Sequence, residues 1–133
     1  MDWRKLFPGK QYVDVMGVDY YNNWPYAASQ SDFDGALDAT DGSGAPKGLQ
    51  AHLDFARSVG LPLAVPEWSG VADAGDSPAY IKGMHDFFAA HAGGGAGQLL
   101  YEIQFNCGGS DYNFTLFGTT EMPASAAEYR KDF

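Results

Sequence analysis

A glutamate and a tryptophan stand at the end of an apolar run in LPLAVPEWSG, residues 61–70. The positions from Leu61 to Val65 are apolar or proline, which is typical of a buried β-strand, and Glu67 and Trp68 follow where that run stops. Two interpretations are open for Glu67. It is either the first solvated residue after a strand, or a catalytic carboxylate at the mouth of a barrel.

Two further segments are predicted strands whose ends carry polar and aromatic side chains. YVDVMGVDYY, residues 12–21, is rich in β-branched and aromatic residues, and QLLYEIQFN, residues 98–106, is another apolar-rich run. Carboxylates and amides bind sugar hydroxyls, and flat aromatic rings cover the C–H faces of sugars, so this inventory suits a carbohydrate site. Hydrolysis of a glycosidic bond needs two carboxyl groups. The strand-end residues are Asp19, Tyr20, Tyr21, Glu67, Trp68, Gln104 and Asn106.

Helices are predicted between and after these strands. Residues 46–60 have apolar side chains at helical spacing and end at a glycine. The segment AGDSPAYIKGMHDFFAAHAGGG, residues 74–95, carries Asp76 or Ser77 as an N-cap, Pro78 in the first turn and glycines at its end. Residues 122–133 indicate a final short helix, whereas residues 22–44 are rich in turn residues and are expected to form a loop. Residues 1–11 resemble the tail of a helix.

Alternation of strands and helices predicts an α/β fold with parallel strands. No glycine-rich phosphate loop follows the first strand, which argues against nucleotide binding. A small open sheet or part of a (β/α)₈ TIM barrel remains. A full barrel takes about 250 residues, and this chain has 133. We therefore expect residues 1–133 to form one domain, a partial barrel that consists of the C-terminal three strand–helix units.

Composition excludes several classes of partner. The net charge is −9 with only 8 basic residues, which argues against nucleic acid. The lone Cys107 excludes an internal disulfide, and the three histidines show no metal-ligand spacing with it, so no metal or other cofactor is expected. No segment is apolar enough to cross a bilayer, and no signal peptide is visible at the start of the sequence.

Four segments in the same order resemble the C-terminal half of family 26 glycoside hydrolases, the β-mannanase family and its relatives. They are VDVMGVDYYNNW, GLQAHLDFARSVGLPLAVPEWSG, SPAYIKGMHDFF and YEIQFN. The resemblance implies a retaining mechanism in which Glu67 is the nucleophile. Tyr21 matches the tyrosine that hydrogen-bonds the nucleophile in this family, and Asp19 matches the aspartate of the same D-x-Y element. It also implies an extracytoplasmic or secreted protein that acts on a polysaccharide.

The sequence departs from the family at two points. Nothing matches the acid/base glutamate, which lies on an earlier strand of the barrel, so the N-terminal half of a barrel or another chain is expected to supply it. The segment YEIQFN stands where mannanases place a tryptophan, which leaves β-mannan and other β-glycans open as substrates. Trp24 and Trp68 are either sugar-stacking platforms or core and rim aromatics. Tyr20, Gln104 and Asn106 complete the predicted substrate-binding set.

A second function remains open, in which the chain is a non-catalytic carbohydrate-binding module or a half-barrel relic that associates with another chain. Glu102 is interpreted as an inward-facing polar residue near the barrel floor or as a salt-bridged outer residue, and not as the missing acid. His85 and Asp86 are expected to lie on a helix surface. Asn113-Phe114-Thr115 fits a glycosylation acceptor pattern, which occurs often by chance.

Overall fold

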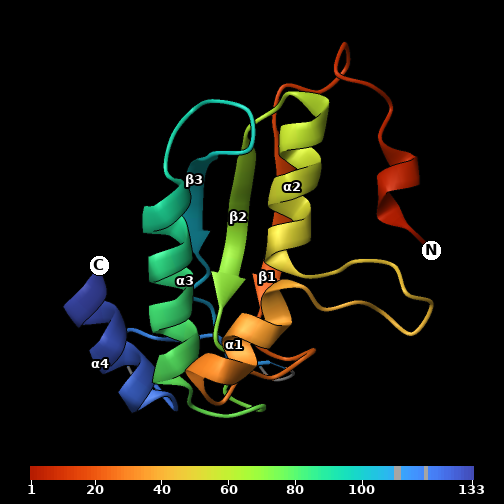
Figure 1. Cartoon of the computed structure of the whole chain (residues 1–133). Helices are drawn as coiled ribbons and strands as arrows, with labels where there is room; N and C mark the ends of the chain where they lie inside the picture. The colour runs from red at the N-terminus through yellow and green to blue at the C-terminus, as the bar shows by residue number, and fades with distance from the viewer. Residues whose placement is uncertain (110–111, 119) are drawn as a thin grey trace.

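A computed structural model describes residues 1–109, 112–118 and 120–133. Its sheet has three parallel strands in the order β1 (Met16–Tyr21), β2 (Leu63–Ser69) and β3 (Leu99–Gln104). The predicted parallel strands are therefore confirmed, with the first beginning later than the sequence indicated. All three strands end at the same edge of the sheet, where the long loops gather (Figure 1).

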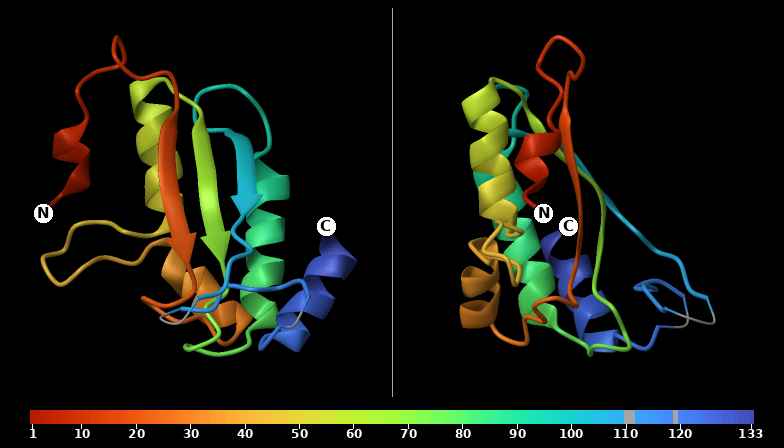
Figure 2. Two further views of the ribbon diagram at one scale, coloured as in Figure 1. Left: turned by 180° about the vertical axis from the view of Figure 1, so that it is seen from behind. Right: turned by 90° about the vertical axis from the view of Figure 1, so that its right-hand side faces the viewer.

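The helices cover one face of this sheet, and no helix of the described residues covers the other face, as the side view in Figure 2 shows. A short 3₁₀ helix, η1, precedes β1. Two helices lie between β1 and β2, where the sequence predicted one. The bounds are η1 (Trp3–Leu6), α1 (Gln30–Leu37), α2 (Leu49–Val59), α3 (Pro78–His91) and α4 (Pro123–Asp132). The α/β class is confirmed, and the sheet is compatible with a barrel-like unit.

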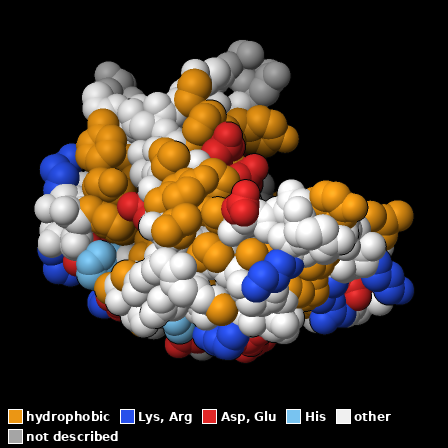
Figure 3. Space-filling view, turned by 90° about the horizontal axis from the view of Figure 1, so that it is seen from above, with side chains coloured by type: hydrophobic (Ala, Val, Ile, Leu, Met, Phe, Trp, Pro, Cys, Tyr) orange, Lys and Arg blue, Asp and Glu red, His pale blue; other side chains and the backbone are white. Residues whose placement is uncertain are grey.

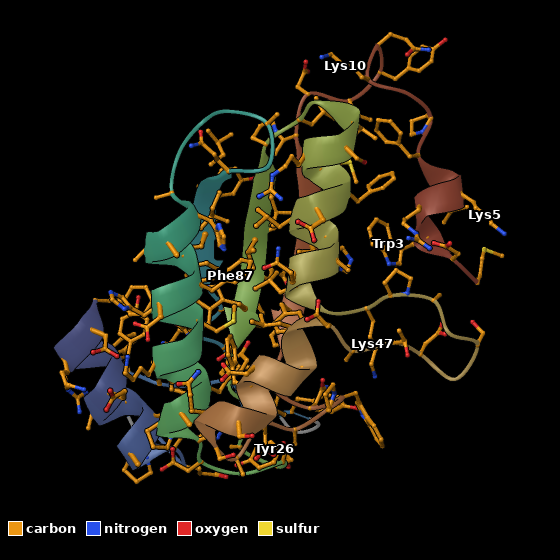
Figure 4. All side chains as sticks on the ribbon, viewed as in Figure 1. Trp3, Lys5, Lys10, Tyr26, Lys47 and Phe87 are labelled. Atoms are coloured by element: carbon orange, nitrogen blue, oxygen red, sulfur yellow. The ribbon has the colours of Figure 1, made fainter. Side chains whose placement is uncertain are left out.

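The core lies between the sheet and the helices α2 and α3. The apolar spacing predicted for α2 places Leu53 and Ala56 in this core, and Gly60 ends the helix in the left-handed conformation with φ 76°. Helix α3 begins at the N-cap Ser77, whose side chain accepts a hydrogen bond from the backbone N–H of Tyr80. The side chain of Phe87 points from α3 into the same layer (Figure 4).

Helix α1 lies in the stretch that the sequence predicted to be a loop, so that prediction is wrong. A capping box starts the helix: Ser29 accepts a hydrogen bond from the N–H of Asp32, and the Asp32 carboxylate accepts one from the N–H of Ser29. Burial of Phe33 then fixes α1 against α3. The Phe33 ring approaches Gly83 so closely that a Cβ there would lie 2.5 Å from the ring.

The first residues form the 3₁₀ helix η1 and not an α-helical tail. Trp3 holds this segment to α2, because its ring stacks on His52 with centroids 4.2 Å apart and its indole N–H donates to the carbonyl of Pro46 at 2.5 Å. Figure 4 shows Trp3 directed toward α2.

Helix α4 is capped by a residue from a distant part of the chain. The carboxylate of Asp76, in the loop before α3, accepts hydrogen bonds from the N–H groups of Ala124 (2.7 Å) and Ser125 (2.8 Å). These donors have no partner inside the first turn of α4. Asp76 therefore joins the starts of α3 and α4.

Candidate functional site

Glu67 and Tyr21 meet on the face of the sheet that carries no helix. The Tyr21 hydroxyl donates a hydrogen bond of 2.7 Å to Oε2 of Glu67, from neighbouring parallel strands. Asp19 is the register partner of Glu67. The structure thus brings together the three residues that the sequence singled out as catalytic.

An irregularity in β2 positions Glu67. Gly17 pairs with Ala64 and Asp19 pairs with Glu67, so β2 advances by three residues where β1 advances by two. Pro66 lies inside this step, and proline has no N–H to donate to a ladder of strand hydrogen bonds, so it favours a bulge here. The extra residue turns Glu67 to the same face as Asp19 and Tyr21.

Charge and burial act on the two neighbours of Glu67 in the same direction. Partial burial, followed by the negative charge of Glu67, raises the pKa of Asp19. Burial also raises the pKa of the Tyr21 hydroxyl, and the hydrogen bond to Glu67 adds to this effect. Tyr21 therefore stays protonated and remains a donor to the carboxylate.

Two phenylalanine rings pack next to the hydrogen-bonded pair of Tyr21 and Glu67. The Tyr21 ring lies 4.8 Å from the ring of Phe114 and 6.2 Å from that of Phe105, measured between centroids. Phe105 and Phe114 also contact one another at 5.5 Å. Sequence reasoning missed both phenylalanines; the available signal was that Phe105 directly follows the predicted strand and that Phe114 lies in the loop after it.

Trp68 is corrected from a possible sugar platform to a core residue. Its side chain is fully buried and packs against the rings of Tyr80 and Phe88. Its indole N–H donates to Oε2 of Glu102. Neighbouring residues of a strand point to opposite faces, so Glu67 on the open face requires Trp68 on the helix-covered face.

Glu102 thus accepts the hydrogen bond of the Trp68 indole N–H. It lies beside the aromatic side chains that pack around Trp68, including Phe88 of α3 and Tyr129 of α4. Among the described residues it forms no ion pair. Neither of the two roles predicted from the sequence, a residue at the barrel floor or a salt-bridged outer residue, describes this position.

Tyr20 is likewise corrected from the substrate-binding set. It packs against the buried core, and its hydroxyl donates to the carbonyl of Ala36 in α1 at 3.3 Å. Burial raises the pKa of Tyr20 to about 12. Its backbone carbonyl accepts a hydrogen bond from the hydroxyl of Tyr80. Tyr20 therefore supports the strand from the side opposite to Glu67.

Gln104 and Asn106 both form hydrogen bonds within the chain at the C-terminal end of the sheet. The Gln104 amide donates to the buried hydroxyl of Ser69 at 3.1 Å and to the Phe105 carbonyl at 2.8 Å. Oδ1 of Asn106 accepts from the N–H groups of Leu116 and Phe117 at 2.7 and 3.0 Å. The Asn106 oxygen is thereby used by the loop backbone, and the role of the Asn106 amide in substrate binding remains a prediction.

Trp24 follows β1 at the same edge and is 81% exposed, so its ring is open to solvent. Tyr26, two residues further on, marks this end of the molecule in Figure 4. The prediction that Trp24 stacks on a sugar remains a prediction.

Two surface pockets, of about 340 Å³ and 450 Å³, lie away from Glu67. The first is next to α2, and the second lies between α3 and the outer edge of β3. Among the residues that the structure describes, Glu67 lies on the open face of the three-stranded sheet and lines neither of these two pockets. Within the described ranges, no group of three or more His, Cys, Asp or Glu side chains is arranged to hold a metal ion. No helix in the part of the chain that the structure describes has the length and apolar character to cross a bilayer.

The geometry around Glu67 can be set against known proteins. Models of known protein families give no match to this sequence. The curated proteins give none either. Asp19, Tyr21 and Glu67 lie together on neighbouring parallel strands of the sheet.

Proposed function

We propose that this chain supplies the nucleophile half of a retaining glycoside hydrolase that acts on β-glycosidic bonds in a polysaccharide, either β-mannan or another β-glycan. In this proposal the three strands are the C-terminal three of a (β/α)₈ barrel. The supporting observation is the hydrogen bond from Tyr21 to Glu67 at the C-terminal ends of two parallel strands, the position at which barrel enzymes carry their active sites.

The Glu67 carboxylate would attack the anomeric carbon and form a glycosyl ester, while the C–O bond to the leaving group breaks. Water then cleaves the ester and regenerates the carboxylate. The Tyr21 hydroxyl fixes the orientation of Glu67 in the resting state, and a nucleophile held on a strand loses little freedom when it attacks. Asp19 lies beside Glu67 on β1. We assign Asp19 to a substrate hydroxyl.

A second carboxyl group must protonate the leaving oxygen, and we propose that it comes from the N-terminal half of the barrel or from another chain. The uncovered face of the sheet supports this need for a partner, because Tyr101 and Ile103 of β3 are about half exposed. Both alternate with Glu102, which bonds the buried Trp68, so they face away from the helices. Seen from above, hydrophobic side chains are exposed across the middle of the molecule (Figure 3). Unpaired strand edges and apolar surface favour association.

A glycoside whose leaving group needs no proton tests the nucleophile in this chain directly. Dinitrophenyl β-cellobioside and β-mannobioside release dinitrophenolate without an acid catalyst. We expect release above the buffer rate, and we expect Glu67→Gln to lose it by several powers of ten. Azide should restore turnover of Glu67→Ala by attacking the anomeric carbon from the vacated side. Equal release by wild type and Glu67→Gln, or none by wild type, would contradict the proposal.

A carbohydrate-binding module without hydrolysis is the second candidate. The open surface around Glu67, which neither pocket includes, favours it over a complete enzyme. Binding of oligosaccharides without any release of dinitrophenolate would identify this function.

A further inference from the structure

The loop after β3 folds back on itself at the edge of the sheet that carries Glu67. Its two arms, Cys107–Gly109 and Tyr112–Phe114, run antiparallel, with a bridge between Gly108 and Asn113. The N–H of Gly109 donates to the carbonyl of Tyr112 at 3.1 Å, and the N–H of Phe114 donates to that of Cys107 at 3.0 Å. We call these two arms the loop hairpin.

Hydrogen bonds fix the loop hairpin to the end of β2. The N–H of Ala72 donates to the carbonyl of Asn113 at 2.9 Å, and the Ser69 hydroxyl donates to the carbonyl of Phe114 at 3.0 Å. Ser69 itself is fully buried. The side chains on the second arm are thus held at a set position relative to β2, which carries Glu67 two residues before Ser69.

An aromatic ladder leads from Glu67 along this arm. Tyr21, which bonds Glu67, contacts Phe114, and Phe114 stacks on Tyr112 with centroids 6.1 Å apart and ring planes 22° apart. Tyr112 is 59% exposed, so it packs on Phe114 with one side and presents the rest of its ring to solvent.

An aromatic ring that is held from behind and open in front is suited to the apolar C–H face of a pyranose. The backing by Phe114 and the anchored backbone reduce the conformational entropy that a ligand would have to remove. Tyr112 is connected to Tyr21 through two ring contacts, Tyr21 with Phe114 and Phe114 with Tyr112, so a ligand that contacts both Glu67 and Tyr112 has to extend along these rings. The ligand of both must be an oligosaccharide or a polysaccharide.

We propose that Tyr112 is a specificity-determining residue that stacks on a sugar unit distant from the one at Glu67, so that the site selects chains over single sugars. This inference rests on the proposed carbohydrate function and assigns it a second binding position. Phe114 supports Tyr112 from one side through ring stacking.

Binding titrations by nuclear magnetic resonance test this assignment. The probes are β-1,4-linked mannotetraose and cellotetraose, with mannose and glucose as short controls. We expect Tyr112→Ala to weaken binding of at least one tetrasaccharide by about three- to tenfold, the range expected for one aromatic stacking contact. Binding of the monosaccharides should not change. Tyr112→Phe keeps the ring and should bind as wild type does.

Tyr12→Ala is the matched control, because Tyr12 is 74% exposed and precedes β1, at the opposite end of the strands from Glu67. It should leave every titration unchanged. Equal tetrasaccharide affinity in Tyr112→Ala and wild type, or no tetrasaccharide binding at all, would overturn the assignment. Loss of dinitrophenolate release in Glu67→Gln together with normal binding by Tyr112→Ala would refute the second position alone. Tyr112-dependent binding without any hydrolysis would instead refute the nucleophile and leave the platform in place.

Discussion

Tyr21 and Glu67, which are 46 positions apart in the sequence, share a hydrogen bond of 2.7 Å across two parallel strands. The bond depends on the bulge around Pro66, because a regular ladder would turn Glu67 away from Tyr21. The Tyr21 hydroxyl is coupled to the Glu67 carboxylate by this bond, so ionisation of Tyr21 changes the free energy of unfolding.

The raised pKa of Tyr21 predicts a pH dependence of stability. The hydroxyl keeps its proton more firmly in the folded chain than in the unfolded chain, where tyrosine ionises near pH 10. Below that pH the contribution is fully present, and above it the unfolded state gains by releasing the proton, so the free energy of unfolding falls. Urea unfolding from neutral pH to about pH 11 should show a steeper decline for wild type than for Tyr21→Phe.

Glu67→Gln should make this decline shallower than in wild type, because the charge of Glu67 contributes to the raised pKa. Tyr12→Phe, at an exposed position, should follow wild type. Identical pH profiles for wild type and Tyr21→Phe would show that the hydroxyl is not coupled to Glu67 in solution.

Truncation of Trp68 and of Trp24 should change the free energy of unfolding by very different amounts. Trp68→Ala removes a fully buried ring and leaves Glu102 without its donor, so we expect a loss of about 3–5 kcal/mol in the free energy of unfolding. Trp24→Ala should change it by less than about 0.5 kcal/mol, because the side chain is exposed. Chemical unfolding measures both, and a small loss for Trp68→Ala would contradict the buried placement.

Two helical glycines offer a matched pair of substitutions. Gly83→Ala would place a methyl group against the ring of Phe33, and we expect a loss of about 1–3 kcal/mol from overpacking. Gly35→Ala in α1 meets no atom within 4 Å. It should therefore stabilise the fold by about 0.5–1 kcal/mol, since alanine favours the helix. Thermal unfolding in which both variants shift the same way would argue against the close packing of α1 on α3.

The strands and two of the longer helices were predictable because local and tertiary signals agree there. Apolar spacing places Leu53 and Ala56 on one face of α2, and Gly60 supplies the left-handed stop. Ser77 and Pro78 begin α3 in the same manner. Helix α1 was missed because its residues are mostly polar and small, so the buried Phe33 gave little periodicity. Its signal was the pairing of Ser29 with Asp32 three residues later.

The pairing of Asp19, Tyr21 and Glu67 was predictable from strand ends, because parallel strands finish at one edge. The orientation of their neighbours was not read from the same pattern. Trp68 and Tyr20 alternate with site residues, and a period of two already sends them to the opposite face. The use of Asn106 was not predictable, because an amide at a strand end binds a loop backbone or a ligand with equal chemistry, and only the folded loop decides between them.

The hydrogen bonds that tie the loop hairpin to Ser69 and Ala72 bear on the inheritance of the site. They couple the segment after β3 to the segment that carries Glu67, so a recombination event between those two segments would break contacts on both sides. Exchange of gene segments upstream of β1 would leave these contacts whole. Descendants of such exchanges would carry a different segment before β1. They would still inherit Glu67, Phe105 and Phe114 together.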